Sequence, residues 1–146
     1  EPKAVTAVLH IFLRVVEAYL RRSCPGASAR ARFGAVSLVH RFGASLNRHL
    51  HYHCCVLDGV FEPLAGGGVQ FRQASALMPE AAAVIQAQVR RRVLPWFSRH
   101  GLLDPDDTRD MLIWDNPAAS PSTLACASPG RTGTAATLLR PAAFRP

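Results

Sequence analysis

The sequence predicts an α+β fold in which an antiparallel sheet is flanked by helices. The expected elements follow the order helix, strands, helices, without the regular strand–helix alternation that builds a parallel sheet. The 146 residues suffice for one domain with its own core, and a hydrophobic share of 49% excludes a disordered polypeptide. No apolar run reaches the ~20 residues of a membrane span, so we expect no membrane partner and a cytoplasmic protein.

The first expected helix extends from Val5 to about Arg22. Its hydrophobic residues recur at spacings of three and four positions, which places them on one side of the helix. Cys24, Pro25 and Gly26 follow directly and end it. The apolar stripe consists of Val5, Val8, Leu9, Phe12, Val15, Val16, Tyr19 and Leu20.

The strands are expected in the next third of the chain. Residues 35–42 are rich in β-branched and aromatic side chains and predict a strand. Residues 49–58 predict a second strand, which Gly59 interrupts or bulges and which residues 60–62 are expected to continue. A loop with three consecutive glycines precedes a short third strand at 69–72.

Two helices are expected after the strands. Pro79 favours the first turn of a helix, because the N–H group that proline lacks would have no partner there. This helix is expected to extend to about His100, with a kink or an end of its regular part at Pro95, and with Gly101 as its C-terminal cap. A further short helix is expected within residues 104–114.

Three alternating histidines, His49, His51 and His53, are the most informative residues of the chain. Side chains alternate between the two faces of a strand, so the three imidazoles are expected on one face. Neutral imidazoles at positions i and i+2 can bind one metal ion. His40, on the neighbouring strand, is a possible additional ligand whose register the sequence does not give. The alternative is a solvent-facing polar strand without a metal.

The charge of the chain favours a nucleic-acid partner. The formal net charge is +7, and every one of the 17 basic residues except Lys3 is an arginine. Arginine forks suit phosphate groups, although surface arginines are often simply solvated. The four cysteines form no C-x-x-C pair, which argues against a zinc ribbon and favours free thiols in a reducing compartment.

The run from Gly34 to Phe61 resembles the central motif of the two-tyrosine transposases of rolling-circle insertion sequences. These transposases belong to the HUH superfamily, which is named for a histidine–hydrophobe–histidine strand. The similarity continues more loosely through residues 90–103 and 110–114. The elements in register with the histidines are Arg41-Phe42-Gly43, Leu46-Asn47 and Leu57-Asp58-Gly59-Val60-Phe61.

The resemblance implies an HUH-endonuclease-like fold and a divalent metal, magnesium or manganese, held by His51 and His53 with Tyr52 as the hydrophobe. His49 and His40 are possible additional metal or polar residues. The family tends to have asparagine or proline at the position of His49 and glutamine at the position of His40. In this family the metal polarises a scissile phosphate of single-stranded DNA, and a tyrosine attacks it to form a 5′-phosphotyrosine.

DNA contacts are expected at Arg41, Asn47 and Arg48, which lie within or beside this motif. The resemblance makes the chain a part of an enzyme that cuts and rejoins single-stranded DNA in transposition. A non-catalytic metal-binding or DNA-binding protein is the alternative, and a metal-dependent hydrolase that adds Asp58 to the histidines is a third hypothesis.

Both tyrosines of the sequence, Tyr19 and Tyr52, are expected to have structural roles. Tyr19 lies on the apolar stripe of the first helix, and Tyr52 faces away from the histidines. We therefore expect a fragment without a catalytic tyrosine. Residues 1–116 are expected to form an incomplete HUH transposase catalytic domain, and residues 117–146 a disordered tail for which a frameshift near Asn116 is one hypothesis.

Overall fold

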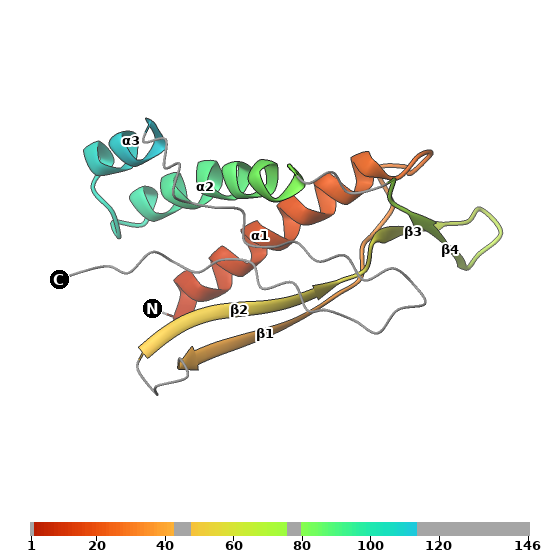
Figure 1. The fold of residues 1–146 in the computed structure, drawn as a ribbon, viewed down its shortest axis with the longest axis horizontal. Helices are drawn as coiled ribbons and strands as arrows, with labels where there is room; N and C mark the ends of the chain where they lie inside the picture. Colours follow the sequence, from red (N-terminus) through yellow and green to blue (C-terminus); the bar gives the residue numbers. More distant parts are fainter. Residues whose placement is uncertain (1, 43–47, 76–79, 114–146) are drawn as a thin grey trace.

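The computed structural model describes residues 2–42, 48–75 and 80–113 (Figure 1). These residues form an α+β fold of three helices and four strands, and every strand pairing is antiparallel, as the sequence predicts. Figure 1 shows helix α1 (Pro2–Ser23) lying between helix α2 (Ala81–Arg99) and the long ribbon formed by strands β1 (Ala35–Phe42) and β2 (Arg48–Val56). The tail predicted at 117–146 lies outside the described residues.

Helix α1 (Pro2–Ser23) confirms the predicted apolar stripe. Its buried residues are Phe12, Val15, Val16 and Leu20, which follow the spacing of three and four. They belong to one core cluster with buried residues of β2 and α2, so α1 is central to the core. The core cluster also contains Cys24, Ala31, Cys54, Val60, Ile85 and Val89.

Strands β1 (Ala35–Phe42) and β2 (Arg48–Val56) pair into an antiparallel ribbon. We call the side that faces α1 the inner face; it contains Ser37, Tyr52 and Cys54. The Tyr52 hydroxyl donates a hydrogen bond to the Val5 carbonyl of α1 (2.8 Å), and the Ser37 hydroxyl donates one to the Cys54 sulfur (3.3 Å). Cys54 is only 3% exposed, so the inner face closes over the core.

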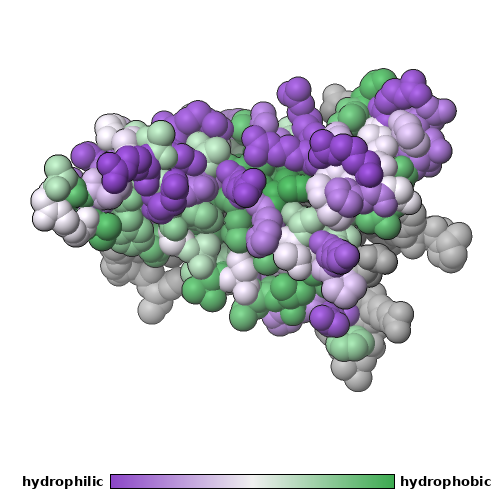
Figure 2. Space-filling model, turned by 180° about the vertical axis from the view of Figure 1, so that it is seen from behind, coloured by the Kyte–Doolittle hydropathy of each residue, from purple (hydrophilic) through white to green (hydrophobic). Residues whose placement is uncertain are grey.

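The opposite side of the ribbon, which we call the outer face, is exposed. It contains His40, His51 and His53, together with the exposed hydrophobic residues Val36 and Leu38. Figure 2 shows hydrophobic residues along the lower edge of the molecule, where Figure 1 places β1. The same two strands therefore present a core-forming side and an accessible side, as a side-chain period of two requires.

The prediction that residues 60–62 continue the second strand is wrong. Strand β3 (Gly59–Pro63) belongs to a separate sheet and pairs with β4 (Val69–Gln73). Gly59 permits this change of partner, because a Cβ atom there would overlap the carbonyl oxygen of Arg72 on β4. Val60 then lies in the core with 0% exposure.

Helix α2 (Ala81–Arg99) contacts α1 through buried residues of its first half. A kink or an end of the helix was expected at Pro95. The helix continues through this residue, so an end there is excluded. Proline removes only the hydrogen bond to the carbonyl of Arg91, and Arg91 is exposed, so water can hydrogen-bond that group.

Helix α2 ends at its predicted cap, and helix α3 begins at an aspartate cap. Gly101 has a φ of +67°, and its N–H donates to the Ser98 carbonyl (3.0 Å), which closes α2 as predicted. Helix α3 (Pro105–Ile113) begins after Asp104, whose carboxylate accepts a hydrogen bond from the Asp106 N–H (2.7 Å). Among the described helices, none has the length and apolar character required to span a membrane.

Candidate metal centre

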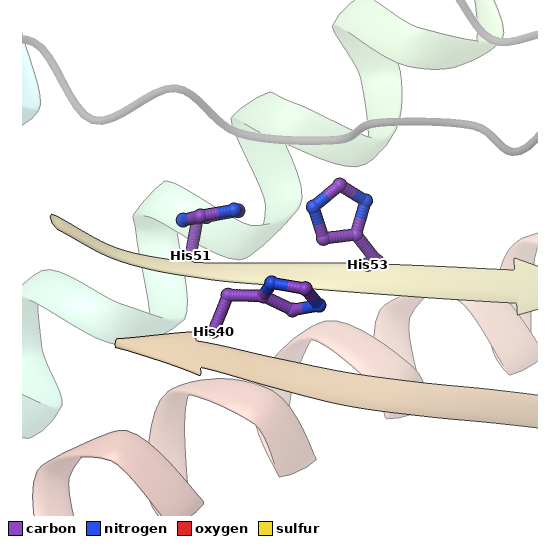
Figure 3. Close-up of side chains that lie close together, drawn as sticks. All are labelled: His40, His51 and His53. Atoms are coloured by element: carbon purple, nitrogen blue, oxygen red, sulfur yellow. The ribbon is translucent and has the colours of Figure 1, made fainter. Parts of the chain in front are cut away.

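The outer face brings together three histidines, one from β1 and two from β2 (Figure 3). The nitrogen atoms that His40, His51 and His53 offer as ligands all lie within 4.8 Å of one another. The ring centroids are 4.6 to 5.1 Å apart, and Figure 3 shows all three rings on the same side of the two strands. His40 is exposed, and the two other imidazoles are half-buried.

The pairing register of the ribbon produces this cluster. His40 lies directly opposite His51, and Leu38 lies opposite His53, so His53 is the diagonal neighbour of His40 on the same face. Directly opposite side chains have Cβ atoms about 5 Å apart, and diagonal neighbours remain within reach of an aromatic ring. The sequence predicts the pair at 51 and 53, whereas only the register makes His40 a member of the cluster.

A β-bulge follows the cluster towards the start of β2. The register changes between His40 and Phe42, so His49 and Leu50 of β2 face the single residue Arg41 of β1. Such a bulge bends the strand and redirects its side chains. Leu50, which lies within the bulge, is 39% exposed.

The donor atoms of the cluster fit a single divalent cation. With metal–nitrogen bonds of about 2.1 Å, the nitrogens around a tetrahedral ion are about 3.4 Å apart. Rotation of the histidine side chains covers the remaining separation, since their ring torsions are broad. No aspartate, glutamate or cysteine joins this group within the described part of the chain, so its donors are imidazole nitrogens. Asp58 instead accepts a hydrogen bond from the Gln73 amide (3.1 Å).

A comparison with protein families assigns this region. A family model with the description "Putative transposase" matches residues 34–116, which is more than half of the chain. The chain belongs to this transposase family. The matched range includes both strands of the histidine cluster and all of α2 and α3. No curated protein and no solved structure matches the transposase chain.

Neither tyrosine of the transposase chain lies with the histidines. The Tyr52 hydroxyl is on the inner face, where it is bonded to α1, and burial and the nearby Cys54 raise the pKa of the phenol. Tyr19 packs against the core cluster, as its position on the apolar stripe predicts. Tyr52 therefore links the ribbon to α1 through its hydroxyl, and Tyr19 contributes to the packing of the core.

The other predicted site residues of the transposase have less definite positions. Arg41 is exposed on β1, next to His40. Arg48 and His49 lie within β2, and Asn47 lies outside the described residues. Of these residues, the structure describes only the side chain of Arg41, so the DNA contacts predicted at Arg41, Asn47 and Arg48 stay a prediction.

The four arginines of α2 are a feature that the sequence analysis missed. Arg90, Arg91, Arg92 and Arg99 lie on a helix that contains no acidic residue between its first and last positions. The described residues supply no ion-pair partner for these arginines. The Trp96 ring lies on the same helix and stacks on His100 at 4.0 Å. The run of three consecutive arginines in the sequence could have indicated a basic segment at this position.

Proposed function

We propose that this transposase domain binds single-stranded DNA of transposon ends and a divalent cation, for which magnesium and manganese are candidates. The observation that supports the proposal is the convergence of His40, His51 and His53 on the outer face of the ribbon. A bound cation supplies Lewis-acid polarisation of a scissile phosphate. The family assignment supports DNA as the substrate.

The histidines of the chain act as a preorganised holder in this proposal. His51 and His53 project from one strand and His40 from its hydrogen-bonded neighbour, so the sheet fixes their spacing before anything binds. The exposure of the outer face leaves room for a phosphate beside the histidines. Three protein ligands leave further coordination positions open, as in catalytic sites and unlike closed structural sites.

Arginines of two elements are proposed to hold the DNA backbone. Arg41 is adjacent to the cluster in sequence, and Arg48 begins the neighbouring strand, with Asn47 preceding it. On the far side of α1, helix α2 adds Arg91, Arg92 and Arg99, which are exposed and have no ion-pair partner within the described residues, as further phosphate contacts. The indole of Trp96 adds an aromatic surface of the kind on which unpaired bases stack.

We further propose that this chain does not cut DNA by itself. A covalent phosphotyrosine needs a tyrosine hydroxyl beside the metal, and the sequence contains only Tyr19 and Tyr52. The hydrogen bond from Tyr52 to Val5 and the packing of Tyr19 in the core keep both away from the outer face. A DNA-binding and metal-binding role without turnover is the form of the function that this chain supports.

Binding of a fluorescent single-stranded oligonucleotide, with and without Mn²⁺, tests the proposal. We expect affinity to fall steeply with salt, and the double substitution Arg91→Glu/Arg92→Glu to weaken binding and to reduce the slope of log K against log salt by roughly 0.7 for each lost phosphate contact. Arg109→Glu is the matched control, since Arg109 already pairs with Asp106 on α3. Equal, salt-independent binding by all three proteins would refute the DNA proposal.

A denaturing gel of the same mixtures tests the absence of turnover. We expect no protein–DNA adduct and no cleaved oligonucleotide at any Mn²⁺ concentration. An adduct that disappears in Tyr52→Phe or Tyr19→Phe would show that one of these tyrosines is a nucleophile after all. Metal binding without DNA binding would favour the alternative of a metal-binding protein.

A further inference from the structure

We propose that His40 makes the cluster a three-imidazole centre that prefers a borderline-soft transition metal, such as Zn²⁺, Co²⁺ or Ni²⁺, over Mg²⁺. The inference rests on the metal centre of the proposed function and goes further by naming the class of cation. It follows from the donor atoms that the described residues bring together, all of which are imidazole nitrogens.

The first argument is the chemistry of the donors. Mg²⁺ is a hard cation that favours oxygen ligands in octahedral geometry at 2.0–2.1 Å and retains several of its waters. Imidazole nitrogen suits zinc, copper, iron and nickel, and the affinity of a nitrogen site rises from manganese towards copper. Within the described part of the chain, no carboxylate joins His40, His51 and His53 to offset this preference.

The second argument is the position of the third ligand. His40 is directly opposite His51 in the ribbon, so the pairing of β1 with β2 holds it in position. The centroid of its ring is 5.1 Å from that of His51 and 4.6 Å from that of His53, and Figure 3 shows it between the two. Strand pairing fixes the backbone of His40, so only its side-chain torsions have to be ordered when a cation binds.

The position of His40 also allows a sharp substitution. Glutamine has a similar length and offers an amide oxygen, so His40→Gln exchanges one nitrogen donor for one oxygen donor without altering the pairing of the strands. His40 is exposed, and therefore the substitution removes no core packing. The variant converts the centre from three nitrogens to two nitrogens and one oxygen.

The experiment is a calorimetric titration of the full chain with CoCl₂, ZnCl₂ and MgCl₂ separately, with the visible absorption of bound Co²⁺ as an independent readout of its ligands. We expect Co²⁺ and Zn²⁺ to bind at least ~100-fold more tightly than Mg²⁺. In His40→Gln we expect Co²⁺ affinity to fall by at least ~10–100-fold. Losses of this size occur when only a residue that hydrogen-bonds to a metal ligand is replaced. The Co²⁺ spectrum should change as well.

Two controls isolate the cluster. His10→Gln makes the same exchange at an exposed histidine of α1 and should leave all titrations unchanged. Cys55→Ser removes the exposed thiol that follows His53 on the outer face, and it should retain the preference for Co²⁺ if imidazoles alone produce it. Loss of the preference in Cys55→Ser, with retention in His40→Gln, would overturn the inference in favour of a thiol ligand.

The outcomes separate the inference from the proposed function. Equal affinity for Mg²⁺ and Co²⁺ in the unaltered chain, or an unchanged preference in His40→Gln, overturns the inference and leaves the metal centre standing. Unchanged binding of every metal in the double variant His51→Ala/His53→Ala overturns the metal centre itself.

Discussion

The two faces of the β1–β2 ribbon are formed by alternate residues of the same two strands, and yet one face is buried and the other is accessible. The inner face places Tyr52 and Cys54 against α1, with a hydrogen bond to Val5 and almost no exposure of the thiol. The outer face presents His40, His51 and His53 to solvent. Along β2, residues that pack against α1 therefore alternate with residues of the histidine cluster.

This division has a physical consequence for mutagenesis. Substitutions that alter the inner face or its support should change the free energy of unfolding and leave the intrinsic metal affinity intact. Substitutions on the outer face should do the reverse. The experiments below test whether stability and metal affinity respond separately to substitutions on the two faces, in order of decreasing expected effect.

The largest effect is expected for Phe12→Ala, which removes a buried aromatic ring from the core beneath the inner face. We expect a loss of about 3–5 kcal/mol in the free energy of unfolding, because a buried Phe-to-Ala change removes apolar burial and leaves a cavity. Urea denaturation followed by circular dichroism measures it. Leu38→Ala, on the outer face and 57% exposed, is the matched control and should change stability by less than about 0.5 kcal/mol.

The second effect concerns the outer face alone. His53→Ala removes one of the two half-buried ligands, and we expect Co²⁺ affinity to fall by about 100-fold, which corresponds to about 2.7 kcal/mol of binding free energy. The metal-free protein should unfold at the same urea concentration as the unaltered chain. A parallel loss of stability without metal would show that the histidines are structural and would end the separation of the two faces.

Tyr52→Phe tests the inner face at the position between the two histidines of β2. The variant removes the hydroxyl that donates to the Val5 carbonyl, and it should cost about 0.5–1.5 kcal/mol of stability. Its metal affinity should equal that of the unaltered chain, since the ring points to the opposite side of the strand. A large change in metal affinity would mean that the two faces are coupled through the backbone.

The smallest effect is a pH dependence that arises outside the ribbon. Hydrogen bonds from the Ser28 hydroxyl and N–H lower the pKa of the Glu62 carboxyl on β3. The folded-state pKa is thus below the unfolded one, so the carboxylate contributes stability above its unfolded pKa, and this contribution is lost as the pH falls through the folded pKa. Glu62→Gln should remove that part of the acid dependence in thermal unfolding. An unchanged pH profile in this variant would contradict the assignment.

Local patterns of the sequence were sufficient for much of the fold. The limits of β1 at Ala35 and Phe42 were predicted correctly from β-branched residues, and Gly101 was correctly predicted to cap α2. The α+β class with antiparallel strands is confirmed. The alternation of His51 and His53 was predicted by the period of a strand, which needs no information beyond the strand itself.

The features that could not be predicted depend on contacts between distant residues. The membership of His40 in the cluster depends on a register that pairs it with His51 and on the bulge beyond it. The separation of β3 from β2 depends on the close approach of Gly59 to the Arg72 backbone on β4. Neither contact produces a periodic pattern in the sequence, so the pairing partners of these strands could not be predicted from the sequence.

The register that pairs His40 with His51 would make the proposed cation centre a reporter of correct assembly. A slip of the two strands by one residue would turn Tyr52 and Cys54 outwards and carry the imidazoles of β2 towards α1. Such a misassembled ribbon would have no cation-binding site, although its content of secondary structure would be almost the same. The number of cobalt ions bound per chain would then measure the fraction of a preparation that has reached the native strand alignment.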